Sequence, residues 1–365
     1  MTRIGRAALL AALLAACPAP ARHIEAPRPP RAGGPTITWK RVASLDDVPN
    51  VAPPPGTYRI HLIDVGTGLS ILVQGADFNL LYDAGSNDKE ESPKRVLSYL
   101  AEAVGPSGDD LCGMPGDKKR IDDVVLSHPH FDHASALDLV VHCYDVRDVW
   151  DSGRVNNAVF YRNFLEAVAR STAHYHTAAS VPSDHVVGVK GEEIKIGDWQ
   201  RFSEGDTVEL GKGARFTILH AEAKELPDPN QNSVVLEVEL GGARLLLVGD
   251  SESGKREDPS YPPGDIEQFL LDHHKRDIAA DILQVGHHGS KTSSRHAFIT
   301  AVHPSLALVS SGPKVYGRTV LPDHEVIDEL TADGATVLRT DEHDRQCPDG
   351  PGGCDSYVIT VAPGK

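Results

Sequence analysis

The sequence predicts a layered α/β fold (α+β in its grouping of strands and helices) with mixed sheets, in one domain over residues 57–362. Strand patterns are followed by helical patterns, and this order occurs twice in succession, which favours sheets covered by helices. No repeat or linker divides these residues. The chain has 365 residues, 40% of them hydrophobic and 24% charged, so it can bury a large core and has a globular composition.

The elements of the first half follow from the spacing of apolar residues, which is continuous or alternating in strands and three to four residues in helices. The expected strands are 58–68, 69–75, 78–86, 121–127 and 146–152, and the expected helices are 93–104, 134–146 and 156–170. Residues 174–206 are polar and irregular, apart from a short strand pattern at 193–196, and are expected to form an insert.

The second half has the same character. The expected strands are 215–221, 233–242, 243–251, 281–289, 306–312, 335–340 and 356–362, and the expected helices are 264–276, 293–302 and 324–334. Gly241-Gly242 predicts a hairpin between two of these strands.

The N-terminus predicts export. Residues 1–16 have two arginines followed by an apolar run that is too short to span a membrane, which is typical of a signal peptide. The run ends in Leu-Ala-Ala-Cys, which resembles the bacterial lipobox and makes Cys17 the predicted lipidation site. A plain signal peptide is the alternative. Residues 17–56 are rich in Pro and Ala and predict an extended tether. We therefore expect a lipoprotein that faces the periplasm or cell surface and contacts the membrane through its lipid anchor alone.

The other four cysteines form an even number, which in an exported protein predicts disulfides. Cys347 and Cys354 enclose a short Pro/Gly-rich loop and are the preferred pair, with Cys112–Cys143 as the remainder. Buried free thiols are the alternative.

The net charge is −16, with 36 basic and 52 acidic residues. Such a chain repels itself and is not a general binder of polyanions. We therefore expect no stable complex with nucleic acid, and the sequence does not indicate an oligomeric state.

A metal motif lies directly after the buried strand 121–127. Residues 127–133 read Ser-His-Pro-His-Phe-Asp-His, so His128, His130, Asp132 and His133 offer three imidazoles and a carboxylate within six residues. This composition and spacing indicate a metal site, with Zn²⁺ preferred and Mn²⁺ or Fe as alternatives. A surface histidine cluster is the alternative, but it would need neither the carboxylate nor the strand-loop-helix setting.

This motif resembles the signature of the metallo-β-lactamase superfamily, whose fold is a four-layer αββα sandwich with one or two metal ions at one edge of the sheets. The segments LLYDAG, LLLVGD and HHGS agree with it. Eight ordered pieces, from IHLIDVGTG to VLRTDEHD across residues 60–344, resemble the hydrolase domain of the ComEC-type DNA-uptake proteins and their stand-alone relatives.

The resemblance implies a ligand set. His128 and His130 bind a first ion, Asp132 and His133 bind a second, and Asp250 bridges them. Asp83 supports the site from behind. Either His287 or His288 completes the set: His287 is preferred because it comes first after its strand, and the other histidine orients substrate or donates a proton. A metal ion lowers the pKa of bound water to about 7, which gives a hydroxide nucleophile at neutral pH. The expected catalytic residues beside it are Asp132, His287 and His288.

One departure from the family pattern concerns the turn before strand 233–242. Many members have a further histidine there, whereas this chain has Asn230, Gln231, Asn232 and Ser233, as in the ComEC-like branch. His220 lies at the end of the preceding strand, which is too early in the sequence to match the family histidine. Three alternatives follow for the first ion: it is weakly held, replaced by solvent, or absent. In the last case the chemistry would depend on a single metal ion.

Further candidates for substrate or supporting contacts are Asn232, Ser290, Lys291, Tyr316 and Arg318. The residues after HHGS either bind a phosphate oxygen, partly through backbone N–H groups, or cap the next helix through Ser293 or Ser294. Arg318 replaces a histidine of the ComEC-like Tyr-Gly-His turn and either binds an anion or lies on the surface.

The function expected from these observations is an exported metal-dependent hydrolase of a nucleotide, oligonucleotide or envelope phosphodiester. The negative charge disfavours long DNA, whose binding depends on Lys and Arg. Hydrolysis of a β-lactam or lactone is one alternative, although the missing histidine argues against it. A non-catalytic surface-binding protein of the same fold is the other, and it would not need a full ligand set.

Overall fold

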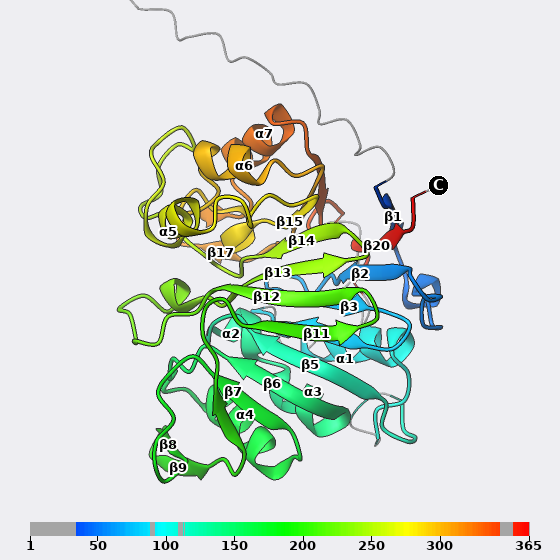
Figure 1. The fold of residues 1–365 in the computed structure, drawn as a ribbon, viewed down its shortest axis with the longest axis vertical. Helices are drawn as coiled ribbons and strands as arrows, with labels where there is room; N and C mark the ends of the chain where they lie inside the picture. Colours follow the sequence, from blue (N-terminus) through cyan, green and yellow to red (C-terminus); the bar gives the residue numbers. More distant parts are fainter. Residues whose placement is uncertain (1–33, 88–91, 109–111, 113, 344–352, 365) are drawn as a thin grey trace, which may run out of the picture.

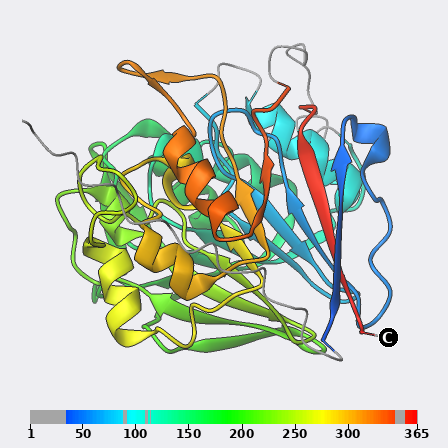
Figure 2. The ribbon, with the colours of Figure 1, turned by 90° about the horizontal axis from the view of Figure 1, so that it is seen from above.

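The computed structural model describes residues 34–87, 92–108, 112, 114–343 and 353–364. Two sheets pack face to face, and helices cover the outer face of each (Figures 1 and 2). The predicted four-layer αββα arrangement is confirmed.

The first sheet has nine strands, antiparallel on one side and parallel on the other. In spatial order they are β1 (Thr36–Val42), β20 (Ser356–Ala362), β2 (Tyr58–Leu62), β3 (Ile71–Gln74), β4 (Asn79–Tyr82), β5 (Arg120–Leu126), β6 (Asp145–Asp151), β7 (His174–Thr177) and β10 (Trp199–Arg201). The helices of this half are α1 (Ser92–Ala103), α2 (Phe131–Ala134), α3 (Leu137–Cys143) and α4 (Val159–Arg170).

The second sheet has seven strands, and the predicted hairpin at Gly241-Gly242 joins two of them. In spatial order they are β11 (Thr207–Gly211), β12 (Ala214–His220), β13 (Val235–Leu240), β14 (Ala243–Leu247), β15 (Ile282–Gln284), β16 (Leu306–Val309) and β19 (Thr336–Arg339). Its helices are α5 (Asp265–His273), α6 (His296–Val302) and α7 (His324–Ala332).

Three apolar cores hold these layers together. The central core lies between the sheets, where residues such as Ile60 and Leu245 are fully buried. One outer core packs α1, α3 and α4 on the first sheet, and the other packs α5, α6 and α7 on the second. Since both faces of each sheet are covered, the inner strands are apolar runs such as Arg120–Leu126, in which six of the seven residues are buried.

The sheet begins before residue 57, where the sequence predicts a tether. Thr36–Val42 pairs antiparallel with Ser356–Ala362 at the sheet edge. The other described residues of the predicted tether, up to residue 56, are irregular apart from one 3₁₀ turn. The segment itself is rich in β-branched and aromatic residues, which favour a strand, although the residues around it are rich in Pro and Ala. Similarly, β7 and β10 of the insert 174–206 extend the first sheet, while β8 (Val186–Val189) and β9 (Glu192–Lys195) form a separate hairpin.

Cys112 and Cys143 form a disulfide inside the first outer core. The predicted partner of Cys354 is Cys347, which lies outside the described residues, as do the predicted signal peptide and Cys17. Within the described part of the chain, no helix has both the length and the apolar character needed to cross a membrane.

Candidate metal centre

The candidate ligands converge because several strands end at one edge of the two sheets. Asp83 follows β4, the HxHxDH motif follows β5, and Asp250 follows β14. His287 and His288 lie in a short 3₁₀ turn after β15. In open α/β sheets, this carboxyl edge is the usual place for a binding site, because the loops from parallel strands meet there.

Asp83 holds the motif loop in place. One carboxylate oxygen accepts from the backbone N–H of Ser127 at 2.7 Å, and the other lies 2.7 Å from both Ser127 Oγ and His133 Nδ1. The partnered Nδ1 orients the ring of His133, so that Nε2 faces Asp250 Oδ1 at 3.2 Å. A carboxylate behind a histidine in this way is typical of metal ligands, since it fixes the tautomer and the ring orientation.

Two overlapping groups of ligand atoms result. His128, His133 and Asp250 form one group, and Asp132, His133 and His288 form the other, with the atoms of each group within 4.8 Å of one another. His130, which was expected to bind the first ion with His128, belongs to neither group, and its Nδ1 lies 2.9 Å from His128 Nε2. The structure gathers the other predicted motif ligands, but His133 is shared by both groups instead of being paired with Asp132 alone.

The donor set fits a divalent metal. His133 Nε2, His288 Nε2 and Asp250 Oδ1 are buried, and none of them makes a well-formed hydrogen bond among the described residues, although His133 Nε2 and Asp250 Oδ1 lie 3.2 Å apart as an ion pair. An unpartnered buried polar atom costs about 1–3 kcal/mol, so three at one point indicate a group that satisfies them together. Imidazole nitrogens with carboxylate oxygens suit Zn²⁺, Mn²⁺ or Fe.

Burial and charge act in opposite directions at this centre. Burial lowers the pKa of His128 well below its ordinary value, so this ring is neutral and can offer a lone pair. Burial also lowers the pKa of His133, but the carboxylates of Asp250 and Asp83 outweigh burial and raise it well above that value. Burial raises the pKa of Asp250, but His133, His288 and His287 outweigh it, so Asp250 is ionised.

His287 and His288 occupy different environments, although both have a positive φ. His288 Nε2 lies 3.8 Å from Asp132 Oδ2 and 3.6 Å from Asp250 Oδ2, while its Nδ1 contacts the carbonyl of Ser310 at 2.9 Å. The sequence preference was for His287 as the ligand, whereas the geometry groups His288 with Asp132 and His133.

His287 lies at the edge of this group and faces the cavity. Its Nε2 is 3.8 Å from Asp250 Oδ2. Its Nδ1 lies 2.9 Å from Glu252 Oε1 and 2.7 Å from Thr292 Oγ1. Glu252 is thus a supporting residue that the sequence analysis missed, although it comes two residues after Asp250.

The turn that lacks the family histidine has a structural role instead. Asn232 is buried, with its amide accepting from Leu226 N–H and donating to the carbonyl of Lys224, so it holds the preceding loop. His220 contacts the carbonyl of Ser233 at 2.7 Å. Neither residue lines the cavity at the metal centre.

A cavity of about 500 Å³ opens over the centre. It is lined by Asn87, His130, Phe131, Asp132, Asp250, Arg256, His287, His288, Ser290, Thr292, Tyr316, Thr319 and Leu321. Tyr316 comes from the hairpin β17 (Val315–Tyr316) and β18 (Thr319–Val320), and its hydroxyl donates to Asp132 Oδ2 at 3.0 Å. Asn87 Nδ2 donates to the same oxygen at 2.6 Å. Both side chains therefore hold the orientation of a candidate ligand.

The other predicted contact residues divide between the cavity and the surface. Ser290 lines the cavity. Lys291 does not: its ammonium pairs with Glu325 at 2.5 Å. Arg318 is exposed at the turn of the hairpin and is absent from the lining. Arg256, which the sequence analysis missed because it belongs to no motif, lines the cavity.

The start of α6 differs from both sequence interpretations. This helix begins at His296 and has no side-chain cap, so neither Ser293 nor Ser294 caps it. The backbone N–H groups of Ser294 and Arg295 donate to the buried carboxylate of Glu267, and they are therefore not available to a phosphate.

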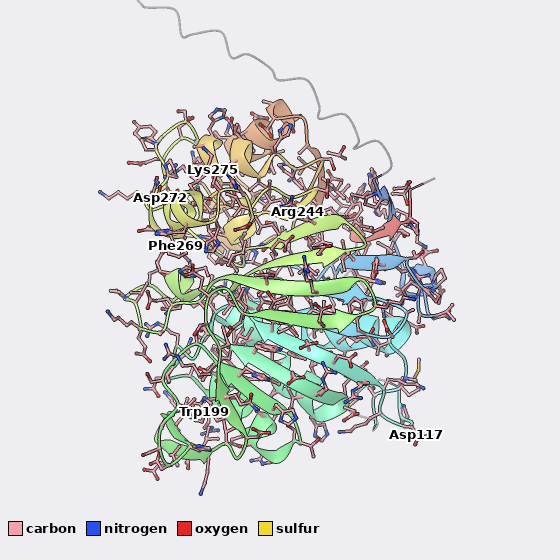
Figure 3. All side chains as sticks on the ribbon, in the orientation of Figure 1. Asp117, Trp199, Arg244, Phe269, Asp272 and Lys275 are labelled. Carbon is pink, nitrogen blue, oxygen red and sulfur yellow. A yellow bond between two sulfur atoms is a disulfide. The ribbon has the colours of Figure 1, made fainter. Side chains whose placement is uncertain are left out.

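Histidines outside the motif have ordinary partners. His176 stacks on Trp150 and contacts Asp148, and His174 pairs with Asp198. His273 is exposed at the end of α5, and its Nδ1 lies 2.9 Å from the carbonyl of Phe269, a residue that Figure 3 labels together with Asp272 and Lys275. Both groups of candidate metal ligands found among the described residues lie at the metal centre and include none of these histidines.

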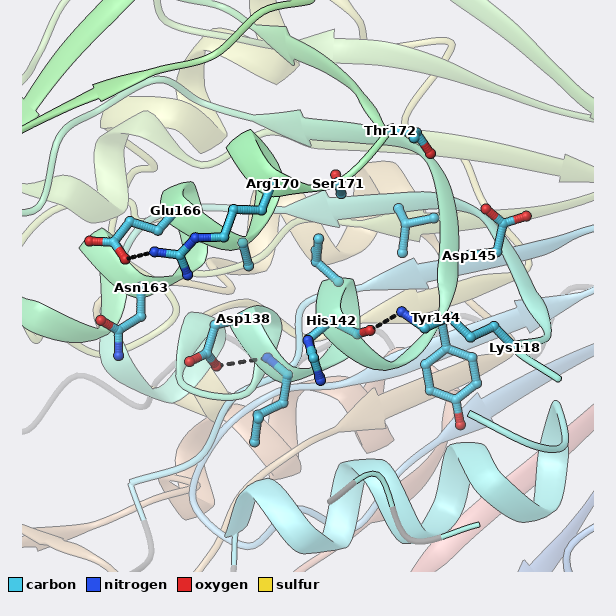
Figure 4. A pocket seen from close by; sticks show the side chains of 14 residues that line it. Lys118, Asp138, His142, Tyr144, Asp145, Asn163, Glu166, Arg170, Ser171 and Thr172 are labelled. Carbon is cyan, nitrogen blue, oxygen red and sulfur yellow. Dashed lines mark hydrogen bonds and ion pairs between the residues drawn. The ribbon is translucent and has the colours of Figure 1, made fainter. Parts of the chain in front are cut away.

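A second cavity, of about 580 Å³, lies between α3 and α4 (Figure 4). The Lys118 ammonium donates to the carbonyl of His142, and Arg170 pairs with Glu166 at 2.6 Å. None of the candidate metal ligands lines this cavity, so it does not offer the chemistry of the metal centre.

Comparison with known proteins agrees with the geometry. The family model of the metallo-beta-lactamase superfamily matches residues 63–312. The chain is 28% identical over 300 residues to ComE operon protein 3 of Bacillus subtilis (strain 168), covering 78% of this chain and 32% of that protein. It is 27% identical over 291 residues to competence protein ComA of Neisseria gonorrhoeae, covering 80% of this chain and 32% of that protein. The chain thus spans about a third of the length of these relatives.

A solved structure with a similar fold is the metallo-beta-lactamase fold protein YhfI from Bacillus subtilis, with a TM-score of 0.42 and 12% identity over 77% of this chain and 95% of that one. The competence-protein relatives confirm the resemblance to the ComEC-like branch. The extent of the family match and the residues gathered around Asp250 agree: the chain belongs to the metallo-beta-lactamase superfamily.

Proposed function

We propose that this chain is an exported metal-dependent hydrolase that cleaves a phosphodiester of a nucleotide, a short oligonucleotide or an envelope component. The observation that carries the proposal is the set of three buried ligand atoms on His133, His288 and Asp250 that make no well-formed hydrogen bond among the described residues, beside an open cavity. A metal would compensate all three atoms, whereas without it the His133–Asp250 ion pair compensates two of them and His288 Nε2 stays without a hydrogen bond in the described part of the chain.

The residues of the site have two roles in this proposal, metal binding and proton transfer. A divalent metal, when bound, supplies an activated water and a positive charge opposite the reacting oxygens. His128, His133 and Asp250 would hold a metal in one group of ligands, and Asp132, His133 and His288 would hold one in the other. His287, oriented by Glu252, presents Nε2 to the cavity, from which it can pass a proton to the leaving group.

A phosphodiester suits this site better than a lactam or lactone. Similar proteins include a ComE operon protein, a competence protein and "Recombination protein 2" of Haemophilus influenzae, and recombination is a process of nucleic acid, whose backbone is a phosphodiester. The cavity has a guanidinium at its wall, which complements an anion. The net charge of −16 favours a small substrate over long DNA.

Export remains part of the proposal. The predicted signal peptide and the predicted lipidation of Cys17 support it, and so does the Cys112–Cys143 disulfide, since such bonds form in oxidising compartments. On this proposal the lipid anchor is the chain's contact with the membrane.

The test uses the full chain, with bound metal measured by elemental analysis and hydrolysis of bis-p-nitrophenyl phosphate measured in Zn²⁺ and in Mn²⁺. We expect metal in the purified protein, diester cleavage, and loss of both in His133→Ala, because His133 belongs to both groups of candidate ligands. Turnover of nitrocefin without diester cleavage would replace the proposal with lactam hydrolysis. Metal-loaded protein that cleaves neither would favour a binding role.

A further inference from the structure

Among the described residues that line the cavity over the metal centre, Arg256 is the one lysine or arginine. It lies in the loop between β14 and α5, six residues after Asp250. The rest of the lining consists of the candidate metal ligands, of polar side chains such as Ser290, and of apolar side chains such as Phe131 and Leu321. The guanidinium is therefore the permanently charged cation of this lining.

The loop that carries Arg256 is firmly held. Arg295 is fully buried, and its guanidinium donates to the carbonyls of Lys255 at 2.6 Å, Glu257 at 2.7 Å and Asp258 at 3.1 Å. These bonds fix the backbone on both sides of Arg256. A buried cation is costly unless several acceptors surround it. Because a movement of the loop would remove the acceptors of the Arg295 guanidinium, the loop conformation is well defined.

The Arg256 guanidinium has N–H donors that its contacts with other described residues do not use. Its Nη2 lies 2.5 and 2.7 Å from the two oxygens of Asp323, and its Nη1 donates to Ser290 Oγ at 3.0 Å. A guanidinium has five N–H donors, and no acceptor among the described residues contacts Nε. The side chain is 38% exposed, so the remaining donors are accessible to a ligand.

The surroundings define the kind of anion. One guanidinium, already sharing its charge with Asp323, matches a single negative charge better than a polyanion. Phe131 packs edge-on against Phe160, with ring centroids 5.2 Å apart, and offers a supported aromatic surface at the same cavity. A monoanionic phosphodiester with an aromatic or apolar group beside the phosphate satisfies both features.

We propose that Arg256 binds a non-bridging oxygen of a monoanionic phosphodiester and thereby selects the substrate of this site. The inference rests on the proposed function for the reaction, but recognition of the anion can be measured without turnover.

The experiment compares metal-loaded wild type with Arg256→Gln, Arg256→Lys and Asp323→Asn, and with Arg276→Gln as a matched control at an exposed position. The measurements are KM and kcat for bis-p-nitrophenyl phosphate and, by calorimetry, the Kd of dimethyl phosphate. Loss of a charge-assisted hydrogen bond should raise KM and Kd roughly 10- to 150-fold in Arg256→Gln, with kcat changed much less. Arg256→Lys should be intermediate, and the control should match wild type.

Asp323→Asn separates recognition from mere support of the loop. The amide oxygen can still accept from Lys291 N–H, as Asp323 does at 2.8 Å, but the charge that offsets Arg256 is gone. We expect KM and Kd to fall or stay unchanged in this variant. A rise similar to that in Arg256→Gln would show that the Arg256–Asp323 pair only holds structure and would overturn the inference.

Failure of the two proposals can be told apart. Diester cleavage with an unchanged KM in Arg256→Gln would overturn the role of Arg256 and leave the proposed function intact. Weaker binding of dimethyl phosphate in Arg256→Gln without cleavage by wild type would support the anion site and contradict phosphodiester hydrolysis.

Discussion

Asp83 Oδ2 lies 2.7 Å from His133 Nδ1, although the two residues are 50 positions apart in the chain. The contact points His133 Nε2 at Asp250, so a residue that does not face the metal position determines the direction of one that does. Asp83 is itself fully buried and also accepts two hydrogen bonds from Ser127.

We expect Asp83→Asn to weaken metal binding by roughly 10- to 100-fold, because an amide holds the ring less firmly and does not polarise it. Chelator competition measures this affinity, and circular dichroism of the metal-free protein controls for folding. Unchanged affinity in a folded variant would mean that Asp83 only braces the loop.

His288→Ala is expected to reduce metal binding more than His287→Ala, by about tenfold or more, because His288 belongs to a compact ligand group and His287 lies outside it. Metal per chain, measured after dialysis against a fixed low metal concentration, distinguishes the two variants. The opposite order would assign the ligand role to His287.

His61 gives a pH dependence that is independent of the metal centre. It is fully buried in β2 beside Tyr99, and burial lowers its pKa from 6.5 to about 3. Between these values the unfolded chain binds a proton at this position and the folded chain does not. Its stabilising contribution is therefore complete above pH 6.5 and is lost as the pH falls toward 3.

Relative to His61→Gln, the wild-type free energy of unfolding should fall by about 1.4 kcal/mol per pH unit within this window. Urea denaturation at several pH values measures the difference between the two proteins. Parallel pH profiles would show that His61 does not titrate in this way.

The Cys112–Cys143 disulfide closes a loop with a sequence separation of 31 residues inside the first outer core. Replacing both cysteines with serine should lower the free energy of unfolding by about 2–4 kcal/mol. Guanidinium denaturation tests this, and reduced wild-type protein should resemble the variant. A change below about 1 kcal/mol would contradict the expected stabilisation.

The sequence by itself determined the layered fold and the metal motif. Both depend on local patterns: continuous apolar runs such as Arg120–Leu126 form strands that are buried on both faces, and three histidines and an aspartate follow one of these strands within six residues. Composition alone was misleading at Thr36–Val42, because the pairing of an edge strand depends on its partner, Ser356–Ala362.

Tertiary structure decided which residues share the site. Arg256 and Asn87 belong to no motif but line the cavity, whereas Lys291 and Arg318, which follow motif residues, lie off it. The grouping of His288 with Asp132 likewise depends on two loops from different sheets. Local patterns arise from the backbone and its neighbours, whereas contacts such as Arg256–Asp323, 67 residues apart, exist only once packing has fixed both loops.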